Sequence, residues 1–391
     1  MTDFADKALL PAGMTDVLPP DASFEAEILE ALMAAYASRG YARIKPPLIE
    51  FEESLLAGLG TAMTAQTFRV MDPVSQRMMG VRADMTPQVA RIAATRLANA
   101  PRPLRLSYAG QVLRVKGSQL RPERQFAQVG AELIGAAEPE ADAEVILMAT
   151  DVLGKLGVTG LSVDIAMPTL VPAVCKEFGV GDSTLAELRR ALDGKDAAGV
   201  ASLAGKLGGP ATEILSTLLS AGGPANETLT SLSRLKLGNA AENERVSLGA
   251  VADILKSRAP NLSITIDPVE NRGFEYHTGV TYTFYARDVR GELGSGGRYL
   301  AENGNGGEPA TGFTLFMDTV LRALPKSQPL SSVYVPAGTP EDQTEAFRAE
   351  GWVTVMGLAP VDDNVKESHR LECTHLLEDG AIQNLNSEDE G

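Results

Sequence analysis

The chain has 391 residues, of which 44% are hydrophobic and 22% charged, values typical of a soluble globular protein with more than one core. Its net charge of −16 argues against a large nucleic-acid surface, because phosphate contacts need clustered cations. Two cysteines without a disulfide or zinc spacing, and a first segment without an apolar run, favour a cytoplasmic protein with no signal peptide and no membrane span.

The sequence falls into four zones, and the first contains a helix, an edge strand and a long hairpin. Apolar residues at helical spacing between Phe24 and Tyr36 predict a helix that stops at Gly40. The next segment, 41–47, predicts an edge strand, because its two prolines cannot donate to a ladder. Segments 104–114 and 125–135 predict a long hairpin around a polar loop.

Residues 171–257 are rich in Ala, Leu, Gly and Ser and predict a helical insertion. Beyond it we expect strands at 262–266 and 281–286, a glycine-rich stretch at 291–297, and a helix over 313–324. The last part predicts strands at 333–335 and 352–356, a helix near 341–350, and a hairpin turning at 379–380. We therefore expect one large domain over 1–324 and a small acidic α/β unit over 325–391, whose net charge is −9.

Polar residues that could bind a small ligand fall in two segments. Alternation in a strand puts Gln128, Gly130 and Glu132 on one face, where the glycine leaves room between an amide and a carboxylate; a solvated sheet face is the alternative. Asp84 and Thr86 would share a side if extended and could hold an ammonium group, although acids and threonines before proline also open helices.

Two arginines are candidate anion clamps. Arg114 could grip a carboxylate through its planar fork, or be an ordinary edge-strand arginine; Arg272, beside Tyr276 and His277, is the second candidate. A metal site at His369, Cys373 and His375 lacks a fourth ligand, so we expect no metal. The glycines of 291–312 lack a following Gly-Lys-Ser/Thr, so we expect no phosphate-binding loop and no cofactor.

Several motifs together resemble a known family. Gly40-Tyr41 with Pro46-Pro47 and Glu50 resembles the dimer-forming first motif of the class II aminoacyl-tRNA synthetases, and 105–132 resembles their second motif in its histidyl form. Segment 272–279 resembles the histidine-recognition peptide of histidyl-tRNA synthetase, and 296–299 the glycine-rich strand after it. The resemblance, over roughly 10–324, implies an α+β fold with a mostly antiparallel sheet flanked by helices.

The departures from that family concern ATP. Lys116 stands where a synthetase has a glutamate that helps hold ATP, and Thr319 stands where the arginine of the third motif binds the terminal phosphate. The loop 117–123 also departs from the family pattern. Without a charged phosphate partner, we expect the activation of an amino acid by ATP to be lost.

The intact amino-acid side and the short acidic tail resemble the regulatory subunits of ATP phosphoribosyltransferase. That resemblance implies a non-catalytic chain that activates a short catalytic subunit and confers feedback inhibition by L-histidine in the first step of histidine biosynthesis. It also implies a homodimer through the first motif within a hetero-oligomer of four plus four chains. The residues implied in histidine binding are Asp84, Thr86, Arg114, Gln128, Glu132, Arg272, Tyr276 and His277. An active histidyl-tRNA synthetase and a repurposed amino-acid ligase remain the alternatives.

Overall fold

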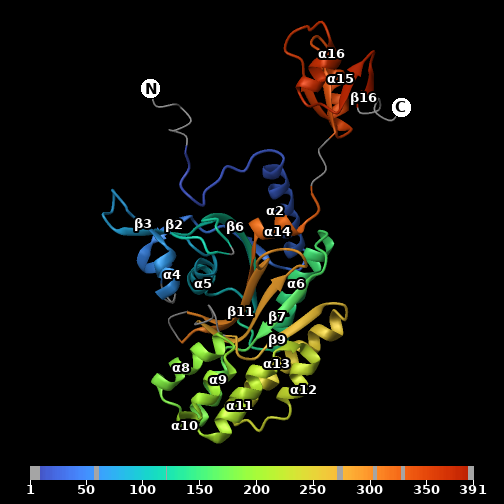
Figure 1. Ribbon diagram of the computed structural model, residues 1–391. Helices are drawn as coiled ribbons and strands as arrows, with labels where there is room; N and C mark the ends of the chain where they lie inside the picture. Colours follow the sequence, from blue (N-terminus) through green and yellow to red (C-terminus); the bar gives the residue numbers. More distant parts are fainter. Residues whose placement is uncertain are drawn as a thin grey trace. The chain divides into compact units, whose positions relative to one another are not determined.

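The computed structural model describes residues 9–56, 61–119, 121–270, 276–302, 306–326 and 331–385. The chain divides into two compact units, Met1–Pro325 and Lys326–Gly391. Figure 1 traces both, coloured along the sequence. Within the described ranges, no helix is both long and apolar enough to cross a membrane.

A large mixed sheet organises the first unit (Figure 1). In its described part nine strands lie in the order β1-β5-β6-β12-β11-β10-β7-β9-β8. The pairs β1–β5 and β7–β9 are parallel, and the others are antiparallel. The strands are β1 (Ala42–Ile44), β5 (Leu104–Leu113), β6 (Gln125–Ile134), β7 (Ser162–Ala166), β8 (Gly223–Pro224), β9 (Ser263–Asp267), β10 (His277–Tyr285), β11 (Gly294–Ala301) and β12 (Glu308–Phe316).

Helices cover this sheet and form a block beyond its β7–β9 end, with α8 to α12 gathered below the sheet in Figure 1. Apolar residues of α2 and α6 pack against β6, β10 and β12 in the main core. One contact in this core is the edge-on packing of Tyr36 on Phe313, with ring centroids 5.7 Å apart. The helices are α2 (Asp21–Ala37), α3 (Glu52–Leu55), α4 (Thr61–Gln66), α5 (Thr86–Thr95), α6 (Pro139–Lys155), α7 (Leu170–Glu177), α8 (Asp182–Asp193), α9 (Ala197–Ser202), α10 (Ala204–Leu207), α11 (Gly209–Ser220), α12 (Ala225–Leu232), α13 (Asn239–Arg258) and α14 (Met317–Ala323).

One predicted element is partly wrong. Residues 313–316, expected to open a helix, instead complete β12, and α14 begins only at Met317. Phe313 and Leu315 pair with Ala131 and Val129 of β6 and are buried. A central strand buried on both faces gives a continuous apolar run, which periodicity alone does not distinguish from a buried helix.

A second, three-stranded sheet lies beside α5 in the order β2-β4-β3. It consists of β2 (Ile49–Phe51), β3 (Phe68–Met71) and β4 (Met78–Val81). The β3–β4 turn is held by Asp72, whose carboxylate accepts the backbone N–H groups of Val74 and Ser75 at 3.1 Å. Large apolar side chains on this sheet and its turn are exposed, among them Met71 at 63% and Val74 at 91%.

The second unit is a small α/β unit with the strand order β14-β13-β15-β16 in its described part. The predicted hairpin between the last two strands is confirmed, and both turn residues, Asp379 and Gly380, have positive φ angles, as a two-residue hairpin loop requires. Its elements are β13 (Ser332–Val335), α15 (Glu341–Ala349), β14 (Val353–Met356), α16 (Asn364–Arg370), β15 (His375–Glu378) and β16 (Ala381–Asn384).

Candidate functional site

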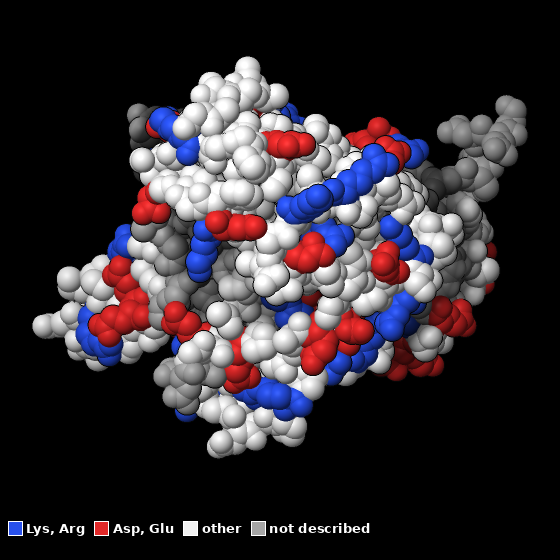
Figure 2. All heavy atoms as spheres, turned by 90° about the horizontal axis from the view of Figure 1, so that it is seen from below, with Lys and Arg blue, Asp and Glu red and all other residues white. Residues whose placement is uncertain are grey.

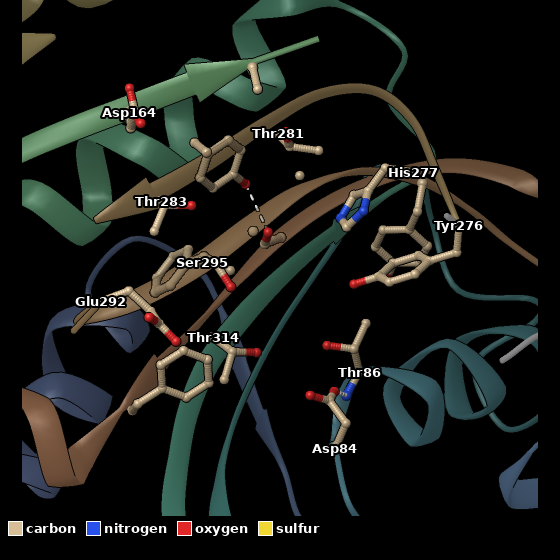
Figure 3. A pocket seen from close by; sticks show the side chains of 18 of the residues that line it. Asp84, Thr86, Asp164, Tyr276, His277, Thr281, Thr283, Glu292, Ser295 and Thr314 are labelled. Carbon is tan, nitrogen blue, oxygen red and sulfur yellow. Dashed lines mark hydrogen bonds between the residues drawn. The ribbon is translucent and has the colours of Figure 1, made fainter. Parts of the chain in front are cut away.

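A cavity of about 510 Å³ opens on the large sheet, where β6, β10, β11 and β12 meet the start of α5. Asp84, Thr86, Tyr276 and His277 lie at one end, and Asp164 lies away from them (Figure 3). Of the residues predicted to bind a ligand, six line this cavity: Asp84, Thr86, Arg114, Glu132, Tyr276 and His277. Arg272 lies outside the residues that the structure describes.

Glu132 is the most deeply placed acid of the site, with 1% of its surface exposed. Its side chain crosses the neighbouring strand at Gly312, where an added Cβ would lie 1.8 Å from Oε2. Three hydroxyls donate to its carboxylate: Thr86 at 2.9 Å, Tyr299 at 3.0 Å and Tyr108 at 3.3 Å. The carboxylate is therefore fixed in direction before any ligand arrives.

Burial raises the pKa of Glu132 to about 8, although the three hydroxyl donors act in the opposite sense. With no cation beside it, the group is therefore mostly protonated near neutral pH. A cationic ligand group beside it would stabilise the ionised form and lower this pKa. The site is thus suited to a group that brings a proton or a positive charge.

Asp84 lies at the start of α5 and accepts the N–H of Thr86 at 2.9 Å. The alternative interpretation of this segment, a helix opening, is therefore correct, since α5 begins at Thr86. Gln128 supports Asp84 from behind, donating its amide N–H to the carboxylate at 2.9 Å and accepting the N–H of Met85 at 3.0 Å. Gln128 is fully buried and is not part of the cavity lining, so it positions Asp84 and does not face the ligand space.

Arg114 is the cation beside Asp84, with Nη2 4.0 Å from the carboxylate. Its Nε donates to the carbonyl of Ala83 at 3.3 Å, and its guanidinium lies 5.1 Å from the centre of the Phe126 ring. Burial lowers the pKa of Arg114, and the nearby Asp84 opposes that shift. Because the ion pair is long, the guanidinium can still donate to a ligand carboxylate in better geometry.

His277 and Tyr276 form the wall opposite Thr86, with ring centroids 4.0 Å apart (Figure 3). The ring of His277 needs the glycine on the neighbouring strand, since a Cβ at Gly297 would lie 2.6 Å from its Cδ2. Burial lowers the pKa of His277 to about 3, so its imidazole is neutral at physiological pH. This wall can stack on a planar ring but adds no charge.

Three further residues of the site were not predicted from the sequence. Tyr108 fills the space above Gly130, where a Cβ would lie 2.4 Å from its hydroxyl, so the expectation that Gly130 leaves room for a ligand is wrong. Tyr299 lies in the glycine-rich segment 296–299, and no part in ligand binding was predicted for it. Arg121 lies in the loop that departs from the family pattern, yet it lines the cavity.

Acidic side chains outnumber basic ones in the lining of the cavity. Five acidic residues and two arginines line it in the described chain: Asp84, Glu132, Asp164, Glu270, Glu292, Arg114 and Arg121. At the Asp84 end an acid pair lies next to Arg114, an arrangement that matches a small molecule with two cationic groups and one carboxylate. Among the described residues, no cluster of three or more His, Cys, Asp or Glu side chains could hold a metal ion.

Known proteins match this chain over most of its length. Residues 13–320 match the histidyl-tRNA synthetase family. A protein of Paramagnetospirillum magneticum described as an ATP phosphoribosyltransferase regulatory subunit is 57% identical, covering 98% of this chain and 100% of its own length. One of Rhodospirillum centenum with the same description is 54% identical, covering 97% and 96%.

Solved structures show the same fold. A crystal structure described as an ATP phosphoribosyltransferase regulatory subunit/histidyl-tRNA synthetase from Bacillus halodurans C superposes with a TM-score of 0.81 at 26% identity, covering 93% of this chain and 96% of that one. Histidyl-tRNA synthetase from Nostoc sp. PCC 7120, at 16% identity, superposes with a TM-score of 0.78 over 95% of this chain and 91% of its own. The class II synthetase-like fold expected from the sequence is confirmed.

Proposed function

This chain belongs to the family of ATP phosphoribosyltransferase regulatory subunits, within the histidyl-tRNA synthetase-like proteins, and on that premise we propose that it senses L-histidine for a separate catalytic subunit. It activates a short catalytic subunit and makes that subunit sensitive to histidine, which binds in the cavity. The observation that carries this proposal is the buried Glu132, oriented by three hydroxyls toward a cavity that also offers Asp84 and Arg114.

Each polar group of histidine has a partner in this proposal. Asp84 and Thr86 hold the ammonium group, and Gln128 keeps Asp84 in position. Arg114 binds the carboxylate, and Arg272, the second arginine expected to bind it, lies outside the described residues. Glu132 binds the imidazole, which lies against the rings of Tyr276 and His277. The neutral His277 suits this position, because a second imidazolium there would repel the ligand.

The ATP side of the cavity supports a regulatory rather than a catalytic role. Thr319 is buried, and its hydroxyl accepts from Arg121 at 3.4 Å and from Arg322 at 3.2 Å. Arg121 is itself paired with Asp318 and Glu292, at 3.1 and 3.4 Å, so its charge is already matched. Lys116 replaces the glutamate that would help to hold ATP in a synthetase. A triphosphate would therefore find few unmatched cations here.

Histidine can inhibit only by binding one state of the complex better than another. A tenfold difference in its affinity for two states corresponds to about 1.4 kcal/mol. The binding groups come from α5, β6 and β10, which are separate in sequence. Ligand binding would hold these elements together, and the catalytic subunit would respond to the ligand-bound state.

The assembly is a homodimer of this chain, formed through the segment around Gly40–Glu50 and joined by catalytic subunits in a complex of four plus four chains. Exposed apolar side chains near this segment support a contact with a second copy. They lie before β2 and along the three-stranded sheet: Leu48, Ile49, Val70, Met71, Val74 and Met78. We expect no nucleic-acid partner, because the net charge of the chain is −16. Acidic and basic side chains alternate over the face seen in Figure 2.

Isothermal titration calorimetry of the isolated chain tests the proposed site. We expect one L-histidine to bind per chain, and we expect no histidine-dependent exchange of pyrophosphate into ATP. The absence of histidine binding would place the effector elsewhere, for instance at a subunit interface. Pyrophosphate exchange would instead identify an active synthetase or a related amino-acid ligase.

A further inference from the structure

A second cavity, of about 1410 Å³, opens on the first unit, and no described residue lines both this cavity and the one proposed for histidine. It is bounded by the segment between α2 and β1, by one side of α6, and by the ends of β10 and α13, where β7 and β9 begin. Cations outnumber acids in its lining, although the chain as a whole has a net charge of −16. We call it the arginine groove after its charged residues, four arginines and two acids: Arg39, Arg105, Arg258, Arg287, Glu144 and Asp151.

Both acids of the arginine groove already have basic partners. Glu144 accepts two N–H groups of Arg105, at 2.7 and 2.8 Å, and the hydroxyl of Tyr41 at 2.8 Å. Asp151 forms an ion pair with Arg39. The acids therefore neutralise two of the four arginines, and the charges of the other two are left over.

The remaining guanidiniums are those of Arg258 and Arg287, which make no hydrogen bond or ion pair within the described ranges. Both residues are exposed. The base of Arg287 is fixed: its backbone N–H donates to the carbonyl of Gly160 at 3.1 Å, and a Cβ on Gly160 would lie 2.6 Å from its own Cβ. The pKa of Glu144 is lowered first by the hydrogen bond from Arg105 and in smaller part by the charge of Arg258, so Arg258 lies near that pair.

The unpaired cations indicate an anionic ligand. A cation in the last turn of a helix is favoured by the helix dipole, which accounts for Arg258 at the end of α13 but not for Arg287, which follows β10. Two unpaired cations that line one cavity repel each other, and an anion between them removes that repulsion. Three neutral side chains in the same lining can donate further hydrogen bonds: Ser162, Asn261 and Ser263.

The number of donors favours a phosphate over a carboxylate. Each guanidinium can donate two parallel N–H groups to an anion, and a phosphate offers three strongly accepting oxygens where a carboxylate offers two. The groove also has room for an organic group beside the phosphate. On its α6 side, a Cβ at Gly154 would meet nothing within 4 Å, and part of the wall is apolar: Leu147, Met148, Leu161 and Leu262.

We propose that the arginine groove binds a phosphate-bearing small molecule of the nucleoside phosphate class. Arg258 and Arg287 bind the phosphate, and the apolar wall contacts the organic part of the ligand. The phosphate-binding residues come from α13 and from the end of β10, outside the segment around Gly40–Glu50 that is proposed to form the dimer. The proposal does not depend on the binding of histidine, because the two cavities are separate.

The test measures binding by calorimetry to the full-length chain, with AMP, inorganic pyrophosphate and adenosine as probes. One series contains saturating L-histidine and another contains none, so that binding of a probe in the histidine cavity is detected as competition. The proteins are the wild type, the double variant Arg258→Ala/Arg287→Ala, Gly154→Leu, and the control Arg290→Ala. Arg290 is the matched control because it is also exposed and lies three residues after Arg287, but does not line the groove.

We expect AMP and pyrophosphate to bind the wild type and Arg290→Ala, with or without histidine, and adenosine to bind at least about tenfold more weakly than AMP. The double variant should bind AMP at least about tenfold more weakly than the wild type, a loss equal to about 1.4 kcal/mol. Gly154→Leu should weaken AMP more than pyrophosphate, because its side chain takes the space of the organic group. The arginine substitutions should leave the fold intact, since both side chains are exposed and unpaired in the described chain.

Three outcomes would overturn this inference and leave histidine sensing untouched. In the first, the wild type binds neither AMP nor pyrophosphate. In the second, the double variant binds AMP as tightly as the wild type. In the third, Arg290→Ala loses as much affinity as the double variant, which would indicate a general effect of charge and not a site. If AMP binds as expected and histidine does not bind at all, the proposed function fails and the phosphate site stands.

Discussion

Replacing Glu132 with glutamine changes one charge and almost no shape. The glutamine oxygen still accepts from Thr86 and Tyr108, whose donors lie 2.9 and 3.3 Å from Oε1 in the wild type. The new amide group takes the place of Oε2 and can donate to the hydroxyl of Tyr299, which now accepts. The variant therefore keeps the pocket intact but cannot pair with an imidazolium.

The expected loss follows from the strength of a charge-assisted hydrogen bond. A hydrogen bond to a charged group contributes about 1.5–3 kcal/mol, which corresponds to roughly 10- to 140-fold in affinity. Glu132→Gln should therefore raise the histidine concentration needed for inhibition of the reconstituted complex by about that factor. The stimulated rate without histidine should stay nearly unchanged, because the carboxylate is buried inside this chain. Glu132→Ala should abolish the inhibition outright.

The assay is the rate of phosphoribosyl-ATP formation in a histidine titration, with calorimetry of the same proteins. Asp164→Asn is the matched control: it removes one charge from the same cavity, at the end away from His277 (Figure 3). Its oxygen still accepts from Thr265, whose hydroxyl lies 2.5 Å away. Two outcomes would refute the assignment of Glu132. In the first, Glu132→Gln is inhibited by histidine as strongly as the wild type. In the second, Asp164→Asn loses histidine inhibition to the same extent as Glu132→Gln.

Four other predictions concern the same unit. Near pH 7.2, histidine binding should release or take up less than about half a proton, as measured by calorimetry in buffers of different ionisation enthalpy. Glu132, with a pKa of about 8, is protonated at this pH, and the free imidazole, with a pKa of about 6.5, is neutral. Together they already carry the one proton that the ion pair needs. A larger proton count would contradict that pairing. Gly312→Ala should abolish histidine binding while the far-UV circular dichroism stays unchanged, since its Cβ would overlap the carboxylate opposite; intact binding would show that this carboxylate is not used. Arg298→Ala should lower the free energy of unfolding in urea by about 3–5 kcal/mol, because it leaves the buried Asp142 without its partner at 2.6 Å; a loss below about 1 kcal/mol would mean that the pair contributes little. Lys116→Glu should leave pyrophosphate exchange at background, and measurable exchange would show that the ATP site needs only this one residue.

The strands around the site could be predicted because their patterns are local. Alternation and turn residues gave the β5–β6 hairpin and the final hairpin at Asp379-Gly380, both of which the structure contains. The start of β12–α14 was misassigned because a strand buried on both faces has no alternation to detect. Only the pairing of Phe313 and Leu315 with β6 shows that these residues are extended.

The site itself was predicted in part, since its residues were found one by one and their roles depend on neighbours far along the chain. The sequence cannot show that Gln128 faces Asp84, 44 positions away, and not the cavity. It also cannot show that Tyr108 fills the space above Gly130, or that Arg121, from a divergent loop, lies over the ring of Phe316. These are tertiary contacts, and no local pattern encodes them.

The most direct measurement of the central claim is the rate of phosphoribosyl-ATP formation by the short catalytic subunit, with and without this chain, over a histidine titration. We predict a rate that rises when the chain is added and then falls as histidine increases, with the fall shifted to higher histidine by Glu132→Gln. A rate that neither rises with the chain nor responds to histidine would contradict the proposed function.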